Sequence, residues 1–246
     1  GEVHHYCSND KCFAIEMEGL SHFVSRQAFN IEGLGPKIIE QLLNESIIKD
    51  AADLFALTVG DLEPLERFAE KAASNLVVAI EEAKEIALPN FIYALGIRHV
   101  GQETAIALAN NFGSFERIST ASLDELINVN DVGDKVAQSL VDWFASQANQ
   151  GLVGRMFASG VEIKEYQAIK GGKLDGQIFI FTGSLDKISR ADAQAKVRQL
   201  GGKIGSAVSK ETDYLVLGED PGSKYKKAQE LGTKIISEID FIKLVE

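Results

Sequence analysis

Four short turns, three of which contain glycine, are the features of this sequence best suited to chemistry. They align on Gly35, Ala69, Gly101 and Gly133, at spacings of 34, 32 and 32 residues. Apolar residues at helical spacing follow each turn, so a helix is predicted to start there. The start of a helix exposes unpaired backbone N–H groups beside the positive end of the helix dipole. Such amides bind phosphate with little help from charged side chains.

The residues around these turns form an internal repeat in which four columns are apolar in every copy. The columns are Ile31, Leu65, Ile97 and Val129; Leu34, Phe68, Val100 and Val132; Ile39, Ala73, Ala105 and Ala137; and Leu42, Leu76, Leu108 and Leu140. Each copy is interpreted as a helix that ends on an apolar residue, a tight turn and a second helix. Residues 26–163 are therefore predicted to form an all-α array of four helix-hairpin-helix units, each resting on its neighbours.

The four turns are not equivalent in the residues that they offer to a phosphate. The second turn, with Arg67 at its tip, lacks both glycines and is expected to be mostly structural, and the fourth has Asp131 at its tip, which repels phosphate. The first and third turns are therefore the better candidates. The residues expected to contact DNA are Gly33, Gly35, Lys37, Lys71, Arg98, His99, Gly101, Gln102, Gly133 and Lys135. A purely architectural array is the alternative interpretation.

The distribution of charge limits how nucleic acid can be bound. The net charge is −11, with 12 Lys and Arg against 25 Asp and Glu in residues 1–165, and 13 against 11 in residues 166–246. A broad electrostatic attraction is therefore absent from the first part. Backbone amides bind phosphate whatever the net charge, and phosphate contacts read no base sequence. Sequence-independent binding of duplex DNA is the predicted activity.

The last eighty residues follow a different pattern. Residues 164–173, which contain Lys170-Gly171-Gly172-Lys173, are interpreted as a linker. After it, strands alternate with helices, which predicts a small α/β domain with a parallel sheet over residues 174–246. The strands are expected at 177–183, 201–204, 214–218 and 234–236, and the helices at 189–200, 223–231 and 239–245.

Composition excludes several classes of protein. Apolar residues make up 45% and charged residues 25% of the 246 residues, as in ordinary globular proteins. The sequence has no apolar run long enough to cross a bilayer and no secretory leader, so a cytoplasmic location is expected. Because the sequence opens at Gly1 and not at methionine, we expect it to be part of a longer chain.

Two segments resemble the bacterial NAD-dependent DNA ligases. The strings Ile31-Glu32-Gly33-Leu34-Gly35 and Tyr93-Ala94-Leu95-Gly96-Ile97-Arg98-His99-Val100-Gly101 are similar to the helix-hairpin-helix domain of that family. Leu174-x-Gly176, Phe181-Thr182-Gly183, Gly201-Gly202-Lys203, Thr212-Asp213-Tyr214-Leu215-Val216 and Gly222-Ser223-Lys224 are similar to its terminal BRCT domain. The resemblance covers nearly the whole chain in the family's domain order. It departs from the family in the second and fourth turns and at Phe241, where BRCT domains commonly have tryptophan.

The resemblance implies a zinc site at the beginning of the chain. Residues 1–25, with Cys7 and Cys12, are similar to the second half of a four-cysteine zinc finger whose first pair lies upstream. Completion of a site by His4 and His5 is a weaker interpretation than two free thiols. For the intact enzyme the resemblance further implies NAD and magnesium as cofactors. It also implies upstream adenylation and OB domains, nicked duplex DNA as the partner, and a monomer.

In the BRCT-like domain the resemblance implies a phosphate site formed by Thr182, Gly183 and Lys224. The alternative is that Thr182 simply ends a strand and Lys224 lies on a solvated helix face. If the domain binds partners in this way, the protein is a non-enzymatic scaffold of DNA repair. A repair polymerase also combines such modules, but it requires paired aspartates of a nucleotidyl-transfer domain, which the sequence lacks.

No catalytic group is predicted in this chain. Lys173-Leu174-Asp175-Gly176 matches the adenylation motif of ligases, but only 70 residues follow it, too few for the rest of a nucleotidyltransferase site. His22, Trp143 and Phe144 are expected to pack rather than to react. The fragment is therefore predicted to be inactive by itself, as the DNA-binding part of a ligase that joins a 3′-hydroxyl to a 5′-phosphate.

Overall fold

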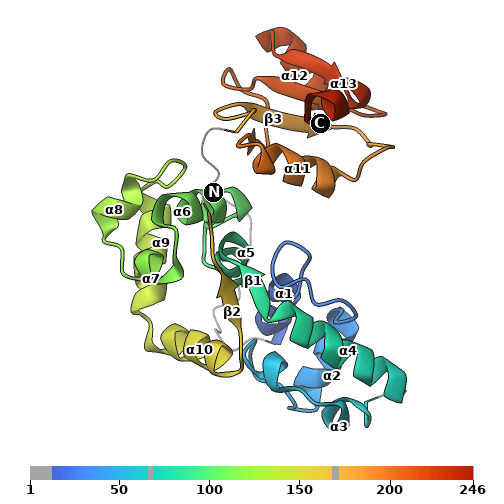
Figure 1. The fold of residues 1–246 in the computed structure, drawn as a ribbon, viewed down its shortest axis with the longest axis vertical. Helices are drawn as coiled ribbons and strands as arrows, with labels where there is room; N and C mark the ends of the chain where they lie inside the picture. Colours follow the sequence, from blue (N-terminus) through green and yellow to red (C-terminus); the bar gives the residue numbers. More distant parts are fainter. Residues whose placement is uncertain (1–12, 66–68, 168–171, 246) are drawn as a thin grey trace. The chain divides into compact units, whose positions relative to one another are not determined.

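The computed structural model describes residues 13–65, 69–167 and 172–245. The chain forms two compact units, Gly1–Gln167 and Ala168–Glu246. Figure 1 shows a mainly helical first unit, coloured blue to yellow, and a second unit of strands and helices in orange and red. No helix in the described ranges is long and apolar enough to span a membrane.

The first pair of hairpins, residues 26–83, follows helix α1. The elements are α1 (Phe13–Phe23), α2 (Pro36–Asn44), the 3₁₀ helix η1 (Asp53–Ala56), α3 (Val59–Leu62) and α4 (Glu70–Ala83). The segment that leads into the first turn is a run of turns and not the expected helix. Its Phe29 amide donates to the Phe23 carbonyl, and its Asn30 amide to the Ser25 carbonyl. These bonds reach six and five residues back rather than the four of an α-helix.

The second pair of hairpins, residues 88–145, repeats the pattern. It contains α5 (Leu88–Ala94), α6 (Gln102–Phe112), α7 (Phe115–Ser119), α8 (Leu123–Ile127) and α9 (Asp134–Ala145), and α10 (Gln147–Ala158) follows. Every described residue of the four apolar repeat columns is at most 7% exposed. The periodic apolar residues therefore form the core that the sequence predicts.

A short parallel strand pair interrupts the helical array. Strand β1 (Glu85–Ala87) lies between the two hairpin pairs along the chain, and β2 (Glu162–Lys164) pairs with it in parallel register. Figure 1 shows the two hairpin pairs on either side of these strands. The predicted all-α array does not include these strands, because three residues are too few to show the alternation of apolar and polar residues that is typical of a strand. The segment predicted to begin the linker thus starts in β2.

Edge-to-face aromatic contacts connect the two hairpin pairs through Phe91 of α5. Its ring centroid lies 6.0 Å from that of Phe29 in the first pair and 5.2 Å from that of Phe115 in the second. Phe157 of α10 stacks on Phe91 at 5.7 Å. Because aromatic pairs at these separations stabilise beyond the burial of their area, Phe91 is a central element of the first unit's core.

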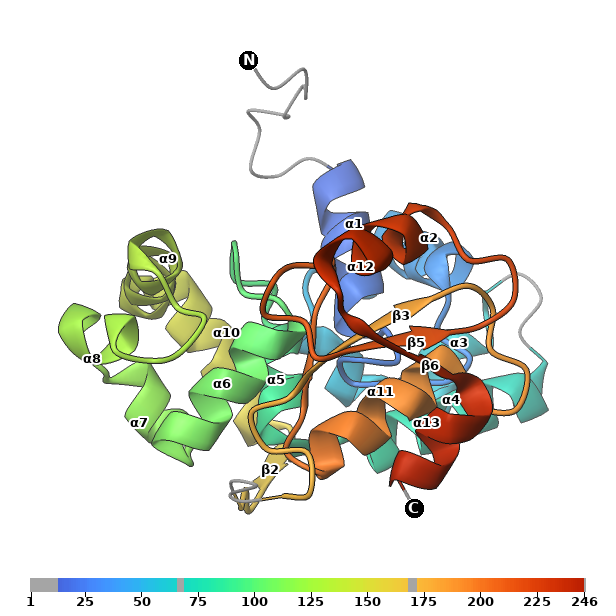
Figure 2. The same cartoon turned by 90° about the horizontal axis from the view of Figure 1, so that it is seen from above.

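The second unit is a four-stranded parallel sheet with helices on both faces. The strand order is β4 (Lys203–Ile204), β3 (Ile178–Thr182), β5 (Tyr214–Leu217) and β6 (Lys234–Ser237). Helices α11 (Arg190–Gln199) and α13 (Glu238–Val245) cover one face and α12 (Ser223–Leu231) the other, as Figure 2 shows. Phe241 is fully buried against Phe181, with ring centroids 5.3 Å apart, so it fills the core position.

Candidate nucleic-acid interface

The described hairpin turns share one backbone conformation despite different residues at the tip. Gly33, His99 and Asp131 have φ of 85°, 68° and 64°. In each turn the next amide donates to the carbonyl three residues back, with N···O distances of 3.3, 3.0 and 3.1 Å. A left-handed residue before such a bond is the geometry of a type II turn, which favours glycine. Histidine and aspartate are held there against their preference, so the surrounding hairpin fixes the turn.

The glycine that starts each following helix is extended and open to solvent. Gly35, Gly101 and Gly133 have φ of −90°, −88° and −93° and ψ of 172°, −179° and 175°. A Cβ added to any of them meets no atom within 4 Å. Packing inside the protein therefore does not require glycine at these positions. Glycine is favoured at the start of a helix, and it also permits close approach of a ligand to the backbone.

These helix starts also lack the side-chain caps found elsewhere in the same unit. No side chain caps α2, α4, α6 or α9. Ser114, Ser122 and Ser146 instead cap α7, α8 and α10. Within the described residues the amides of Gly35, Gly101 and Gly133 donate no hydrogen bond. The hairpin turns thus present unpaired N–H groups to solvent, as a phosphate site requires.

The predicted cations of the turns are available to a ligand. Lys37, Lys71, Arg98 and Lys135 are exposed and have no carboxylate partner among the residues that the structure describes. Lys84, Arg155 and Lys164 of the same unit, in contrast, form ion pairs. Positive charge in this acidic unit is thus left unneutralised beside the turns.

The remaining turn residues are placed less favourably. His99 is exposed at the third tip, whereas Gln102 is half-buried and already has an interaction partner, as does Asp131. Arg67, at the second tip, lies outside the described residues, and α4 starts after Ala69 in the same extended conformation as the glycines. The first, third and fourth turns are thus equally free of neighbours at the glycine, and the fourth differs by its acidic tip.

His22 supports the third turn, a role that the sequence did not indicate. Its Nε2 lies 2.7 Å from the Tyr93 carbonyl oxygen, and its ring packs on that of Tyr93 at 4.5 Å. It also borders Gly96, which has a φ of 63° and links α5 to the turn. Helix α1 is thereby attached to the end of α5. The prediction that His22 packs is correct.

The candidate phosphate residues of the second unit lie beyond the carboxyl ends of its two central strands, β3 and β5. Thr182 ends β3 and is 5% exposed, and half-buried Lys224 lies in the first turn of α12, which follows β5. Gly183 has a φ of 78°, and a Cβ there would lie 2.2 Å from the Glu219 carbonyl oxygen. Close packing beside the Ser184–Glu219 bridge therefore explains this glycine without any ligand.

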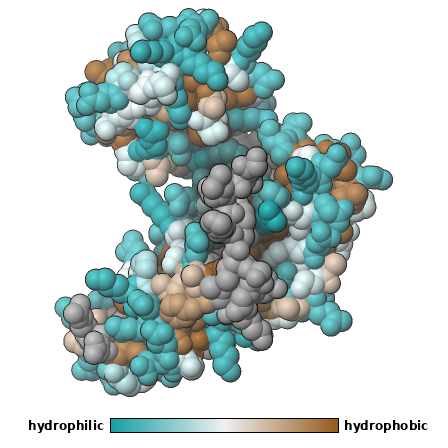
Figure 3. Space-filling view, turned by 180° about the vertical axis from the view of Figure 1, so that it is seen from behind, coloured by the Kyte–Doolittle hydropathy of each residue, from teal (hydrophilic) through white to brown (hydrophobic). Residues whose placement is uncertain are grey.

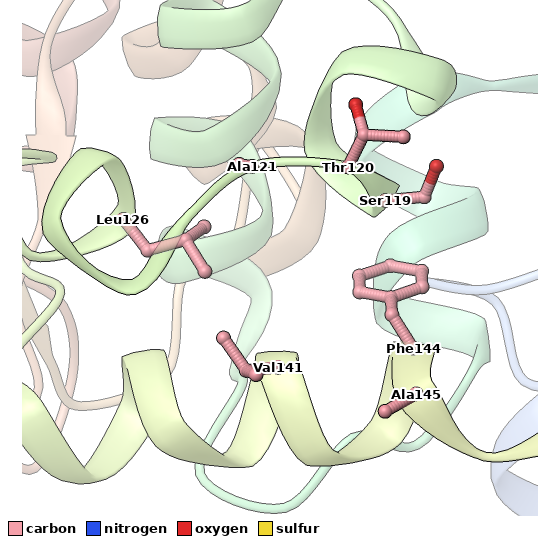
Figure 4. A pocket seen from close by; sticks show the side chains of 7 residues that line it. All are labelled: Ser119, Thr120, Ala121, Leu126, Val141, Phe144 and Ala145. Atoms are coloured by element: carbon pink, nitrogen blue, oxygen red, sulfur yellow. The ribbon is translucent and has the colours of Figure 1, made fainter.

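The other candidate sites show no metal-binding cluster within the described residues. Leu174, within the adenylation-like string, is 1% exposed in the core of the second unit. Cys7 and Cys12 lie outside the described residues, and within those residues no cluster of three His, Cys, Asp or Glu side chains suits a metal ion. A cavity of about 200 Å³, shown in Figure 4, contains no titratable side chain. Its lining is Ser119, Thr120, Ala121, Leu126, Val141, Phe144 and Ala145.

The surface in Figure 3 is mainly hydrophilic, with scattered apolar side chains. Isolated exposed apolar side chains are normal on a globular protein and need no ligand to explain them. The unpaired amides and cations of the hairpin turns are therefore the best candidate interface of the first unit.

Three family models match the chain. Residues 26–82 match the SAM-like helix-hairpin-helix tandem, residues 90–153 the helix-hairpin-helix motif, and residues 170–245 the BRCA1 C-terminus (BRCT) domain. The chain thus contains tandem helix-hairpin-helix domains followed by a BRCT domain, and the predicted fold class is confirmed.

Curated relatives match over the full length of the chain and are DNA ligases. The chain is 44% identical to a DNA ligase of Pelotomaculum thermopropionicum over 99% of its own length and 36% of the relative's. It is 45% identical to one of Desulforudis audaxviator and 42% identical to one of Geobacter sulfurreducens, over 100% of its length and 37% of theirs. The chain therefore spans little more than a third of the relatives that it matches.

Proposed function

We propose that this chain is the non-catalytic, DNA-binding C-terminal part of an NAD-dependent DNA ligase. Upstream adenylation and OB domains of the same protein supply the chemistry in the cytoplasm, where the intact monomer seals nicks during replication and repair. A lysine of the adenylation domain would attack the adenylyl phosphorus of NAD and release nicotinamide mononucleotide, and the 5′-phosphate at the nick would then displace the lysine from AMP. The 3′-hydroxyl displaces the AMP and closes the backbone. Magnesium neutralises the phosphoryl charge during these transfers.

One observation carries the proposal for this chain. Three hairpin turns with different tip residues have one backbone geometry, no side-chain cap and an open face at the glycine. Repetition at intervals of 32 to 34 residues suits a ligand that itself repeats, such as the phosphates along a duplex. Backbone amides also explain how a unit with a net charge of −13 binds a polyanion.

In this proposal the turn residues have different roles. Gly33, Gly35, Gly101 and Gly133 allow the backbone to approach phosphates, and Lys37, Arg98 and Lys135 add charge. Lys71, His99 and Gln102 make further contacts with phosphate or sugar. Because such contacts position a protein without reading bases, the array binds duplex DNA of any sequence and holds it for the upstream catalytic domain. In the intact protein, Cys7, Cys12 and the upstream cysteine pair would hold zinc in the finger whose second half is residues 1–25.

A comparison of DNA substrates tests the proposal. The 246-residue chain is expected to bind nicked and intact duplexes more tightly than single strands and to seal no nick when NAD and magnesium are supplied. Equal binding of single strands contradicts duplex recognition, and sealing contradicts the non-catalytic assignment. Sealing by the same chain extended with its upstream sequence tests the ligase assignment.

A DNA-repair scaffold is the second candidate. It is favoured by the position of Thr182 and Lys224 beyond the carboxyl ends of strands β3 and β5. Removal of residues 174–246 separates the two. The ligase proposal expects most duplex binding to survive the truncation, because the hairpins lie in the first unit. A near-total loss of duplex affinity instead assigns the main site to the BRCT domain.

A further inference from the structure

The segment that follows the fourth hairpin contacts both hairpin pairs. We name residues 147–167, which contain α10, β2 and Tyr166, the clasp. Matches to the two family models on either side end at residue 153 and begin again at residue 170, so most of the clasp belongs to neither. Its contacts therefore need an explanation of their own.

Arg155 attaches the clasp to the first pair. Its guanidinium donates through Nη2 to Asp50, and through Nη1 to Asp53 Oδ1 at 3.2 Å. Both acceptors are fixed by backbone amides. Asp53 Oδ2 accepts from the Lys49 amide at 2.8 Å, and Asp50 Oδ1 accepts from the Ala52 amide at 3.0 Å. The two carboxylates are thus oriented before the arginine arrives, which makes the contact directional.

Tyr166 and Phe157 attach the clasp to the second pair. The Tyr166 hydroxyl donates to Asn110 Oδ1 of α6 at 2.7 Å, and burial raises the pKa of this hydroxyl. Phe157 lies 5.8 Å from Phe115 of α7, centroid to centroid. Strand β2 pairs with β1, where Lys164 and Glu85 form an ion pair at 3.3 Å. The clasp is therefore anchored on the second pair and between the pairs, and reaches the first pair through Arg155.

Directional polar contacts add to apolar packing in setting the angle between the two pairs. Contacts such as that between Phe29 and Phe91 hold the pairs together, but hydrophobic attraction has no directional preference. Two hydrogen bonds from one planar guanidinium to fixed carboxylates resist rotation and sliding. Arg155 is thus suited to set the orientation of the first pair relative to the second.

Orientation matters because each pair has its own turns. When two binding sites are linked rigidly in the right geometry, the second binds at a high effective concentration and affinity rises without new contacts. If the geometry is wrong, that gain is lost.

We propose that Arg155 and Tyr166 are positioning residues for duplex binding: the clasp holds the two hairpin pairs at the angle at which the first and third turns bind one DNA duplex together. This inference rests on the proposed function of the turns. It adds that affinity for long duplexes depends on residues that do not touch DNA.

Dependence of affinity on duplex length tests the inference. With duplexes from about 8 to 24 base pairs, which are roughly 27 to 82 Å long at 3.4 Å per pair, the wild-type chain is expected to show a step in affinity. The step marks the length at which both pairs reach the DNA. Arg155→Met is expected to reduce affinity about tenfold above the step and less than twofold below it. Arg155→Lys restores part of the loss.

Two further variants keep the test decisive. Arg117→Met removes the same charge from an exposed site on α7 and is expected to leave the step unchanged. Tyr166→Phe removes only the hydroxyl that donates to Asn110 and is expected to reduce the size of the affinity step. Circular dichroism checks that the variant is folded. An unchanged step in both Arg155→Met and Tyr166→Phe overturns the inference. A length-independent loss in Arg155→Met means direct phosphate contact and overturns it as well. Failure of the wild-type chain to bind any duplex instead refutes the proposed function.

Discussion

Two kinds of helix start coexist in the first unit. Helices α7, α8 and α10 begin at a serine whose hydroxyl accepts a hydrogen bond from a first-turn amide, with N···O distances of 3.3, 3.3 and 3.5 Å. Helices α2, α6 and α9 begin at a glycine with no side-chain cap. Ser at the start of a helix stabilises it by about a few tenths of a kcal/mol relative to Gly. The hairpin helices forgo that stabilisation at three corresponding positions.

Some glycines of the second unit show the same contrast, although Gly222, which precedes the uncapped helix α12, faces open space like the turn glycines. In the second unit Gly183, Gly202 and Gly218 have backbone or side-chain atoms within 3 Å of an added Cβ, so the fold itself requires them. Gly35, Gly101 and Gly133 face open space. A glycine that internal packing does not require, placed before uncapped amides, is the feature that points to an external ligand.

Replacing both Gly35 and Gly101 by valine is expected to have the largest effect on duplex affinity. We expect the affinity for nicked duplex to fall about 100-fold, because loss of a hydrogen bond to a charged group at each turn costs about 1.5 kcal/mol or more. The fold is expected to persist, since an added Cβ meets no neighbour at either position. Fluorescence anisotropy and a thermal melt measure the two effects.

Gly19→Val is the matched control, because Gly19 is exposed on α1 and its added Cβ also meets nothing. It is expected to bind as tightly as the wild-type chain. Equal affinities for the double variant and this control refute a role of the two turns in binding.

Asp131→Gly tests whether the acidic tip of the fourth turn weakens duplex binding. Removal of the carboxylate from a left-handed tip with a φ of 64° gives the fourth turn the same residue as the first. We expect the duplex affinity to rise by up to about tenfold, or roughly 1.4 kcal/mol. A titration at fixed salt checks this, with Asp134→Gly as the comparison for simple loss of one negative charge. No gain beyond that comparison means that the fourth turn does not face DNA.

Ser122→Ala tests whether the helix starts that have a serine cap contribute to stability and not to binding. The Ser122 hydroxyl caps α8, and the Glu125 carboxylate in return accepts from the Ser122 amide at 2.9 Å. We expect the substitution to lower the free energy of unfolding by about 1 kcal/mol and to leave duplex affinity unchanged. Chemical denaturation and anisotropy are the measurements, and a clear loss of affinity would mean that capped helix starts also take part in binding.

The smallest expected effect is a pH dependence from the same cap. Hydrogen bonds from the Ser122 amide and hydroxyl lower the pKa of Glu125 below its ordinary 4.5. A lowered pKa in the folded state stabilises the protein above the unfolded pKa, and this contribution is lost as pH falls through the folded pKa. The difference in melting temperature between the wild-type chain and Glu125→Ala should be constant from pH 7 to about 5 and shrink below it. A difference that stays constant to pH 3 contradicts the role of the ionised carboxylate.

The sequence predicts the elements that repeat or alternate. Four apolar columns reveal the hairpins, and the short apolar runs of the last eighty residues reveal β3, β5 and β6 and the helices between them. Glycine and lysine at the turns indicate the interface, because a turn is local and its residues are adjacent in sequence.

Contacts between distant segments leave no such trace. Arg155 and Asp50 are 105 residues apart, and His22 and Tyr93 are 71 apart. A single sequence contains no pattern that pairs them. Strands β1 and β2 have three residues each and no periodic signal. The turns were therefore predictable from the sequence, whereas the residues that hold them in place were not.

Binding of this chain to a nicked duplex over a series of salt concentrations tests the central claim most directly. If backbone amides hold the phosphates, the wild-type chain binds at low salt with a shallow slope of log affinity against log salt, since few cations displace counterions. The four unpaired cations of the turns set an upper limit to the slope that amide binding predicts. A much steeper slope contradicts amide binding and indicates a wider set of lysine contacts. Absence of duplex binding at low salt refutes the hairpin interface altogether.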